Sequence, residues 1–433
     1  MLRLDKSTPF SWKKEIFAGL TTFFTMAYVM VVNPIILKDA GIPFSQSFMA
    51  TIIATIVGTL LMGVFAKYPI AIAPAMGLNA YFAYSVVKAH QGMSYQVALS
   101  AVFVMGIIFV LISLTPLRTT LIKAIPASLK HAITAGIGLF IAFIGMRMSG
   151  LIKDHPTNLV ALGDLHSPPV ILTLVGLFTT LICISLNIPA ALFIGMVVTG
   201  IIAYLTGQLH FDKGFIAVPS IPEPIVLNPI QAVSDVIQFG LYGAVFSFLL
   251  VTLFDTTGTF LGVSKQAGLT KGDETPNSSR AMLSDSIASL VGSIFGTSPT
   301  SAYIESASGV TAGGRTGFTA VVVAIMFAIC AFFSPLMGSL TGVAAITSPA
   351  LIIVGSMMIS HVRYLNWDHY EESFPAFLVI LSMPLTSSIA TGISLGFITY
   401  PIMKVLKGKW KEVHPLIYVF AVLFVIQLIF VPH

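Results

Sequence analysis

The 433-residue chain has few charged side chains: Asp, Glu, Lys and Arg make up 9% of it, whereas 56% is hydrophobic and the mean hydropathy is +0.94. A soluble globular domain carries about 25% charged residues, so this composition excludes a water-soluble protein of this size. The net charge of +5 lies in the short segments between apolar runs and requires no nucleic-acid partner.

Cysteine is also scarce, since only Cys183 and Cys330 occur, both inside apolar stretches. Single cysteines in such places are small core residues rather than disulfide partners. The nine histidines are scattered, with no pair at the spacing of metal ligands. The sequence therefore predicts no metal site and no cofactor.

Long apolar runs dominate the chain, many of them about 20 residues long, the length of a helix that crosses a bilayer. The predicted crossings are 16–37, 44–66, 70–88, 95–116, 129–148, 168–186, 189–207, 238–262, 281–296, 299–310, 317–336 and 342–360. The tract 371–404 has basic residues at both ends and is predicted to cross twice, with a break near Ser387–Thr391. A further apolar run follows at 415–431. The predicted fold is an all-α polytopic membrane protein with about fourteen transmembrane segments.

The distribution of Lys and Arg predicts the orientation, because cytoplasmic loops carry an excess of both. Segments predicted outside carry fewer basic residues than those predicted inside. We therefore expect a multi-pass protein of the cell inner (plasma) membrane with a cytoplasmic N-terminus. The basic residues placed inside are Arg3, Lys6, Lys13, Lys14, Lys67, Arg118, Lys123, Lys130, Lys265, Lys271, Arg280 and Arg315.

The chain also resembles itself. Residues 55–61 (TIVGTLL) match 289–295 (SLVGSIF), and residues 101–117 match 320–336 without a gap. Apolar helices match one another by chance, but shared Gly and Ser/Thr-Pro-Leu positions in the same order favour a duplication. If each unit has seven segments, the second is inverted relative to the first, as in transporters that bind substrate near the membrane midplane.

This duplication divides the chain into five parts. They are a cytoplasmic N-terminus (1–14), a first seven-segment repeat (15–207), an extracellular connection (208–237), a second, inverted repeat (238–404) and a C-terminal segment with a further apolar helix (405–433).

Two acidic residues interrupt the apolar background, Asp255 in LFDTTGT and Glu305 in TSAYIES. An ionised carboxylate at bilayer depth is costly, so such residues normally face a cavity and mark a substrate or proton pathway. Structural alternatives are weaker. Lys265 lies ten residues from Asp255, about 15 Å along a helix, which is too far for a pair. Glu305 could instead be satisfied by helix N–H groups, but we favour a functional role for both acids.

The third and tenth crossings, APAMGLNAY and SPTSAYIE, each place a proline five or six residues before a polar side chain. Proline removes a backbone donor and disfavours helix before it, which predicts non-helical backbone at Pro74–Asn79 and Pro299–Glu305, followed by helix. Such backbone is tolerated at this depth only where protein or a watery cavity surrounds it. We therefore expect Asp255, Glu305 and Asn79 to converge on one cavity near the middle of the membrane.

The motifs APAMGLNAYFAY, LFDTTGT and TSAYIESASGV give the chain a resemblance to the AzgA-like purine permeases. This group lies within the wider nucleobase:cation symporter or nucleobase-ascorbate transporter family. The resemblance covers nearly the whole chain. It implies a core domain (about 15–116 and 238–336), a gate domain (about 129–207 and 342–404), and short strands in crossings 3 and 10 that meet at the substrate. It further implies import of purine bases by proton symport with alternating access.

The resemblance implies that Asp255 and Glu305 bind the base and couple its movement to protons. A carboxylate accepts from two purine donors at once, and burial raises the pKa of a carboxylic acid, so one acid can hold the proton. Uracil permeases carry a histidine where this chain has Thr259, so no histidine role transfers, and Thr259 could equally be a helix-packing hydroxyl. The predicted substrate-binding residues are Asp255, Glu305, Asn79, Thr259, Ile304 and Ala80.

Several alternatives stay open at this stage. The sequence does not rank hypoxanthine, guanine and adenine, favours a proton over sodium, and leaves a homodimer open. The runner-up is a carrier of the same fold for a pyrimidine base or an anion, although two acids would repel an anion. An intramembrane protease is disfavoured because the motifs Tyr-Asp and Gly-x-Gly-Asp are absent, so no enzyme activity is expected. Inverted repeats favour a carrier over a channel.

Overall fold

The structure is a computed structural model that describes residues 2–4, 10–88, 93–115, 117–211, 214–270 and 275–430. Helices account for most of these residues, and two short two-stranded sheets interrupt them. Nine helices in the described ranges are long and apolar enough to cross a membrane. Shorter or broken apolar elements lie between them, so the predicted all-α architecture agrees with the structure.

The first half of the chain contains α1 (Trp12–Met26), α2 (Val29–Asp39), α3 (Phe44–Leu61), η1 (Met62–Ala66), β1 (Ile72–Pro74), α4 (Met76–Ala80), η2 (Tyr81–Val87), α5 (Tyr95–Ser113), α6 (Leu117–Ala124), α7 (Ala127–Met148), β2 (Ile152–His155), β3 (Leu159–Leu162), α8 (Pro168–Ser185) and α9 (Ala191–Leu205). The second half contains α10 (Pro229–Gln238), α11 (Tyr242–Gln266), α12 (Ser278–Phe295), β4 (Thr300–Ala302), α13 (Ser306–Thr311), α14 (Gly317–Cys330), η3 (Ala331–Phe333), α15 (Ser334–Ser339), η4 (Leu340–Gly342), α16 (Ala344–Ile359), η5 (Ser360–Tyr364), α17 (Tyr370–Thr386), α18 (Ile389–Leu406), η6 (Trp410–Glu412) and α19 (Pro415–Phe430). The predicted break in the tract 371–404 is confirmed, because α17 ends at Thr386 and α18 begins at Ile389.

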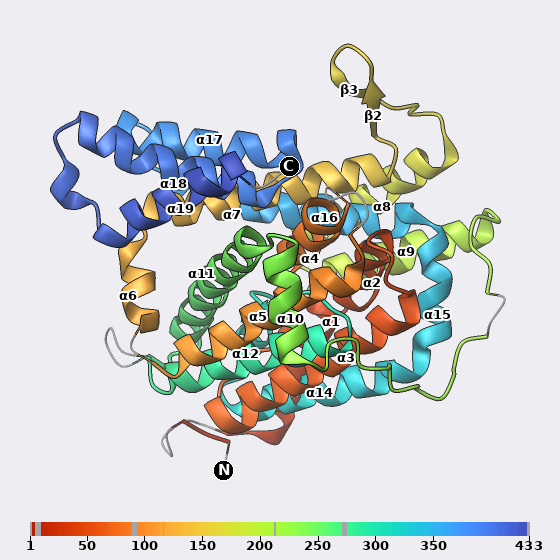
Figure 1. Ribbon diagram of the computed structural model, residues 1–433. Coiled ribbons are helices and arrows are strands. Elements are labelled where there is room, and N and C mark those ends of the chain that lie inside the picture. Colours follow the sequence, from red (N-terminus) through yellow and green to blue (C-terminus); the bar gives the residue numbers. More distant parts are fainter. Residues whose placement is uncertain are drawn as a thin grey trace.

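The helices form two groups, each built from both halves of the chain. In one group, α5 packs on α12, and α3 packs on α12 and α14. In the other, α7 packs on α16 and α17, and α8 and α9 pack on α16. Figure 1 shows α17, α18 and α19 along the top of the molecule, above α11, α5 and α12, with the β2–β3 hairpin projecting beyond the helices. Each group therefore needs helices from both repeats.

Glycines allow the closest helix contacts in both groups. A methyl group on Gly355 of α16 would lie 2.4 Å from the carbonyl oxygen of Gly138 in α7. In the other group, a methyl group on Gly317 of α14 would lie 1.8 Å from the carbonyl oxygen of Gly63. Small residues let helix backbones approach closely where lipid supplies no hydrophobic drive to pack.

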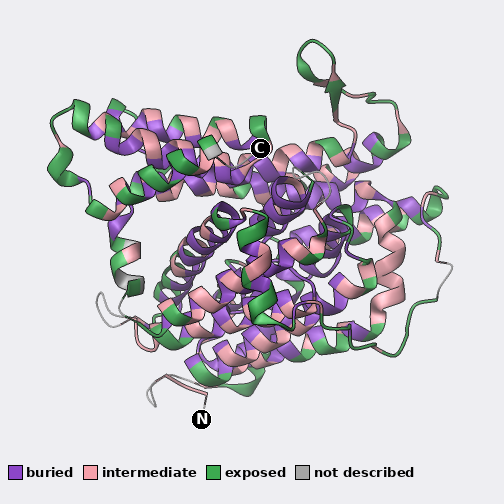
Figure 2. Ribbon diagram, viewed as in Figure 1, coloured by how far each residue is buried: buried purple, intermediate pink, exposed green. Residues whose placement is uncertain are grey.

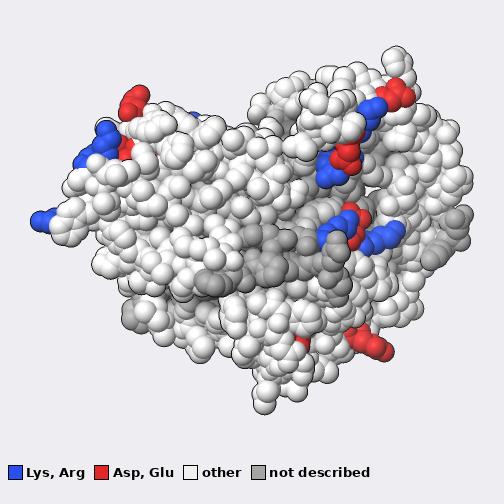
Figure 3. All heavy atoms as spheres, turned by 45° about the horizontal axis from the view of Figure 1, so that its top comes forward, with Lys and Arg blue, Asp and Glu red and all other residues white. Residues whose placement is uncertain are grey.

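The outer surface is apolar. Large hydrophobic residues such as Leu111, Phe178 and Ile201 are exposed. Buried positions concentrate in the interior of the molecule, whereas exposed positions lie on its outside (Figure 2). Lys, Arg, Asp and Glu gather in a few clusters on an otherwise uncharged face (Figure 3). Exposed apolar patches of this extent are a liability in water but are expected against lipid.

The two broken crossings meet through their strands. β1 and β4 pair antiparallel, with Ile72 opposite Ala302 and Pro74 opposite Thr300. Short helices, α4 and α13, follow the strands, so the predicted order of extended backbone and then helix is confirmed in both crossings. The predicted non-helical stretch Pro74–Asn79 is wrong beyond its first residues.

The reason for the shorter stretch is local. The amide of Asn79 already donates to the carbonyl of Ala75 at 3.0 Å, so α4 starts at Met76 and includes Asn79. Proline restricts the residue before it but not those after it, which is why helix resumes so soon. In the tenth crossing, by contrast, helix resumes only at Ser306, and Glu305 occupies the N-cap position of α13.

The outer edges of this small sheet are buried, and neighbouring helices satisfy their backbone groups. The hydroxyl of Thr59 in α3 accepts from the amide of Ile72 and donates to its carbonyl, both at 3.0 Å. The hydroxyl of Ser289 in α12 accepts from the amide of Thr300 at 2.9 Å. Open strand edges are costly at bilayer depth, so these hydroxyl groups stabilise the broken crossings.

Candidate functional site

Glu305 lies between β4 and α13, where the extended part of the tenth crossing becomes helical. The Tyr28 hydroxyl donates a hydrogen bond of 2.6 Å to Oε1 of Glu305. Tyr28 is buried at the break between α1 and α2, so its ring is fixed by packing. Two interrupted segments from opposite ends of the chain therefore meet at this carboxyl group.

Asp255 lies in the middle of α11, and Ser301 of β4 lies beside its carboxyl group. The cavity beside Asp255 is lined by residues of both helix groups, among them Gly77 and Leu78 of α4 and Ile133 of α7. Its volume is about 20 Å³, which holds about one water molecule. A cavity of this volume is too small for a purine base.

The structure brings Asp255 and Glu305 together around β4, close enough for their carboxyl groups to interact electrostatically. Like charges at short range resist simultaneous ionisation. Asn79 is placed differently, because it is fully buried and its Nδ2 donates to Oδ1 of Asn33 in α2 at 2.9 Å. The neighbours of Asn79 on α4, Gly77 and Leu78, line the cavity with Asp255.

The other predicted site residues occupy three different environments. Ala80 is fully buried in the last position of α4, and Thr259 is buried one turn beyond Asp255 on α11. Ile304 is 61% exposed, directly before Glu305. On α11, Gly258 and Gly262 follow Asp255 on the same helix face, and a methyl group added to either would meet no atom within 4 Å. Both glycines are exposed on the surface of α11.

Tyr28 is a site residue that sequence reasoning missed. A tyrosine in an apolar segment is ordinary, and no proline announces the break between α1 and α2. The signal exists only in three dimensions, because Tyr28 contacts a residue 277 positions away in the chain.

Asp285 was also missed, although the same reasoning that singled out Asp255 applies to it. It lies fully buried in α12, within the predicted crossing 281–296. Its carboxylate accepts from the hydroxyls of Thr256 in α11, at 2.5 Å, and Thr300 in β4, at 2.7 Å. Asp285 thus ties α11 to β4, the two elements that carry Asp255 and lead into Glu305.

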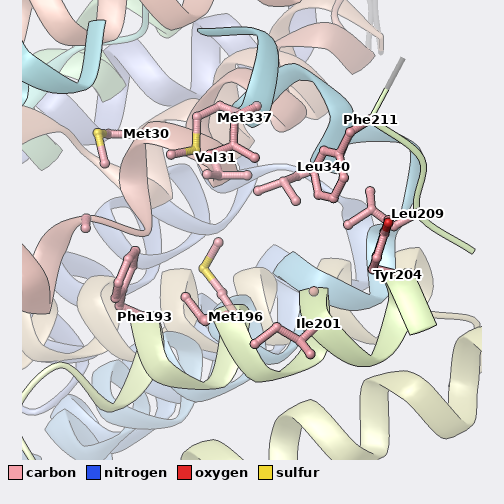
Figure 4. Close-up of a pocket in the computed structure, with 14 residues that line it drawn as sticks. Met30, Val31, Phe193, Met196, Ile201, Tyr204, Leu209, Phe211, Met337 and Leu340 are labelled. Carbon is pink, nitrogen blue, oxygen red and sulfur yellow. The ribbon is translucent and has the colours of Figure 1, made fainter. Parts of the chain in front are cut away.

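A larger cavity of about 320 Å³ lies elsewhere, between α2, α9 and α15 (Figure 4). Its wall consists of apolar side chains, including Met30, Met196 and Met337, and the Tyr204 hydroxyl group is the polar group at one end. A site that orients a polar ligand needs several converging polar groups. The acidic site, not this cavity, supplies them.

These features define a class of protein: a helical membrane permease with two broken crossings that meet at partly buried acids. The protein-family model described as the Permease family matches residues 13–395, and the chain belongs to this family. The guanine/hypoxanthine permease PbuO of Bacillus subtilis (strain 168) is 62% identical over 420 residues, 96% of this chain and 97% of that protein. The adenine permease AdeP of Escherichia coli (strain K12) is 43% identical over 97% of this chain and 93% of that protein. The resemblance seen in the motifs is confirmed, and the chain is a multi-pass membrane transporter, not an enzyme.

Solved structures show the same fold. The transmembrane domain of a cyanobacterium bicarbonate transporter, BicA, aligns with a TM-score of 0.62 at 16% identity, covering 88% of this chain and 97% of that one. The murine anion transporter Slc26a9 in the inward-facing state aligns with a TM-score of 0.64 at 13% identity, covering 93% of this chain and 69% of that one. At such identities the likeness concerns the fold alone, and it confirms the all-α polytopic class with inverted repeats.

Proposed function

We propose that the protein imports purine nucleobases (hypoxanthine, guanine or adenine) together with protons, by alternating access. The observation that carries the proposal is the pair of acids, Asp255 and Glu305, held together around β4 where the two broken crossings pair. The printed names of the relatives, guanine/hypoxanthine and adenine permeases, support a purine as the substrate.

The acids suit this ligand chemically. A purine presents ring N–H groups and, in guanine and adenine, an amino group, and a carboxylate accepts from two such donors at once. With one carboxyl group binding the base, the other can carry the proton, because both ionised together would repel. Asn79, Thr259, Ile304 and Ala80 complete the proposed substrate-binding set, and Glu305 and Asp255 the proton-coupling set.

The cavity beside Asp255 supports movement between two domains. Its walls come from α4 and α11 in one group and from α7 and α16 in the other. We assign the first group to a core domain (about 15–116 and 238–336) and the second to a gate domain (about 129–207 and 342–404). Separation of the domains would widen a one-water cavity into a purine site, with the N-terminus on the cytoplasmic side of the inner membrane.

Uptake of radiolabelled hypoxanthine, guanine and adenine tests the proposal. We expect uptake to rise as the external pH falls from about 8 to 6, a range in which a buried carboxylic acid binds a proton, and to collapse with a protonophore. The measurement is the initial uptake rate in cells that express the protein, against the same cells without it. Uptake that ignores the protonophore and follows external sodium would replace the proton with sodium, and absence of uptake of all three bases would refute the purine assignment.

Tyr28→Phe tests the link between the first crossing and Glu305. Loss of the 2.6 Å hydrogen bond removes a charge-assisted contact, so we expect the KM for purine uptake to rise about tenfold. Tyr68→Phe is the matched control, since the Tyr68 hydroxyl is bonded to the carbonyl of Pro276 instead, and its KM should stay at the wild-type value. A Tyr28→Phe protein with the wild-type KM would show that the hydrogen bond has no part in substrate binding.

A further inference from the structure

A chain of buried polar side chains links α2, α3 and α4. Asn33 of α2 donates from Nδ2 to the hydroxyls of Thr51, at 2.7 Å, and Thr297, at 2.9 Å. Its Oδ1 accepts from Nδ2 of Asn79 at 2.9 Å. All four side chains are fully buried. Four polar groups are therefore held together in the interior, one of them a proposed substrate-binding residue.

Proton accounting fixes the direction of these hydrogen bonds. A threonine hydroxyl has one proton, and Thr51 donates it to the carbonyl of Ser47 at 2.6 Å. Toward Asn33 it can therefore only accept. This requires the amide nitrogen of Asn33 on the Thr51 side and its oxygen on the Asn79 side, although the two ends of an amide have nearly the same shape.

The orientation of the Asn33 amide in turn determines the orientation of the Asn79 amide. Because Asn33 offers an oxygen, Asn79 must offer its amide nitrogen in return, and its own Oδ1 turns away. That Oδ1 is buried and has no hydrogen-bond partner. A buried acceptor without a donor is costly, and a ligand N–H group would satisfy this one.

We propose that Ser47, Thr51 and Asn33 form a relay that fixes Asn79 as a hydrogen-bond acceptor for an N–H group of the purine. Asn33 and Thr51 are then positioning residues that act through Asn79 and do not touch the substrate. Leu78, the residue before Asn79, lines the cavity with Asp255, so the unpaired Oδ1 belongs to a residue next to the cavity wall in the chain. The site would thus offer acceptors to a ligand rich in donors. This inference rests on the proposed function.

The relay can be tested by a double-mutant cycle in purified protein, with the Kd for radiolabelled purine as the readout. Asn79→Ala and Asn33→Ala should each weaken binding about three- to tenfold, the loss of one hydrogen bond. If Asn33 acts through Asn79, the double variant should bind no more weakly than Asn79→Ala alone. Additive losses would mean that Asn33 has a separate, structural role and would overturn the relay.

Thr51 supplies a second test that keeps both amides. Thr51→Val removes the hydroxyl that sets the direction and should weaken binding, whereas Thr51→Ser keeps the hydroxyl and should restore it. Thr55→Ala is the matched control: this hydroxyl is buried one turn further along α3 and has no partner, so its loss should leave the Kd unchanged. Equal Kd values for the Val and Ser variants would contradict the relay even if Asn33→Ala failed to fold.

These results separate the two proposals. If the wild type and Thr55→Ala show neither binding nor uptake of purine, the proposed function fails. If both bind purine and the cycle is additive, only the relay fails.

Discussion

Glu305→Gln is expected to abolish purine uptake while the protein stays folded in the membrane. Glutamine keeps the shape of the side chain and an oxygen that can accept from Tyr28, but it has neither charge nor a titratable proton. Hydrogen bonds to a charged group contribute about 1.5–3 kcal/mol, so binding should weaken by about 10- to 100-fold, and proton coupling should be lost in addition. The measurement is initial uptake rate divided by the amount of protein in the membrane.

Glu223→Gln is the control for this variant. Glu223 is an exposed acid in the segment before α10, and the Glu223→Gln variant should take up purine at the wild-type rate. A single sharp melting transition in detergent would show that Glu305→Gln is folded. Uptake by Glu305→Gln at the wild-type rate, with the normal response to pH, would remove this residue from the mechanism.

Gly355→Leu is expected to prevent stable folding. The first carbon of the new side chain would lie 2.4 Å from the carbonyl oxygen of Gly138 and 2.8 Å from the side chain of Ala142. Overpacking costs about 1–3 kcal/mol where side chains can shift, and here the obstacle is helix backbone, which shifts less easily. We expect little protein in the membrane and a melting temperature well below that of the wild type.

The control is the same Gly→Leu substitution at a position that makes no close helix contact. Gly200 lies in α9, and a carbon added there would meet only one atom within 4 Å, at 4.0 Å. Gly200→Leu should therefore reach the membrane in normal amounts and melt near the wild-type temperature. Should Gly355→Leu melt at that temperature as well, the close contact between α7 and α16 would not limit stability.

The sequence reveals residues that stand out against their own surroundings. Asp255 and Glu305 could be found because a carboxylate contrasts with an apolar segment, and Asp285 could have been found in the same way. Tyr28 and Asn33 could not, because neutral side chains in a hydrophobic helix are common and their partners lie hundreds of residues away. Their roles depend on how α1 and α2 break, which no proline marks.

In the fold, too, features that depend on neighbouring residues could be predicted, whereas features that depend on distant residues could not. The prolines Pro74 and Pro299 act on the backbone next to them, so the onset of extended structure in both crossings could be predicted. The length of the extended part could not, because it depends on strand pairing and on the helices that satisfy each strand. This is why Asn79 lies in a helix although Glu305 lies at the start of one.

The pairing of β1 with β4 also bears on how the protein is made. Next to this pairing, the amide of Ala71 donates a hydrogen bond to the hydroxyl of Ser306, 235 residues later in the chain. During synthesis the first repeat is complete long before its partner strand exists, and unpaired backbone is costly in lipid. The third crossing must therefore be the last part of the first repeat to settle, and it can do so only when the tenth crossing arrives. Neither repeat can reach its final structure alone, so the smallest unit that completes folding is the chain with both.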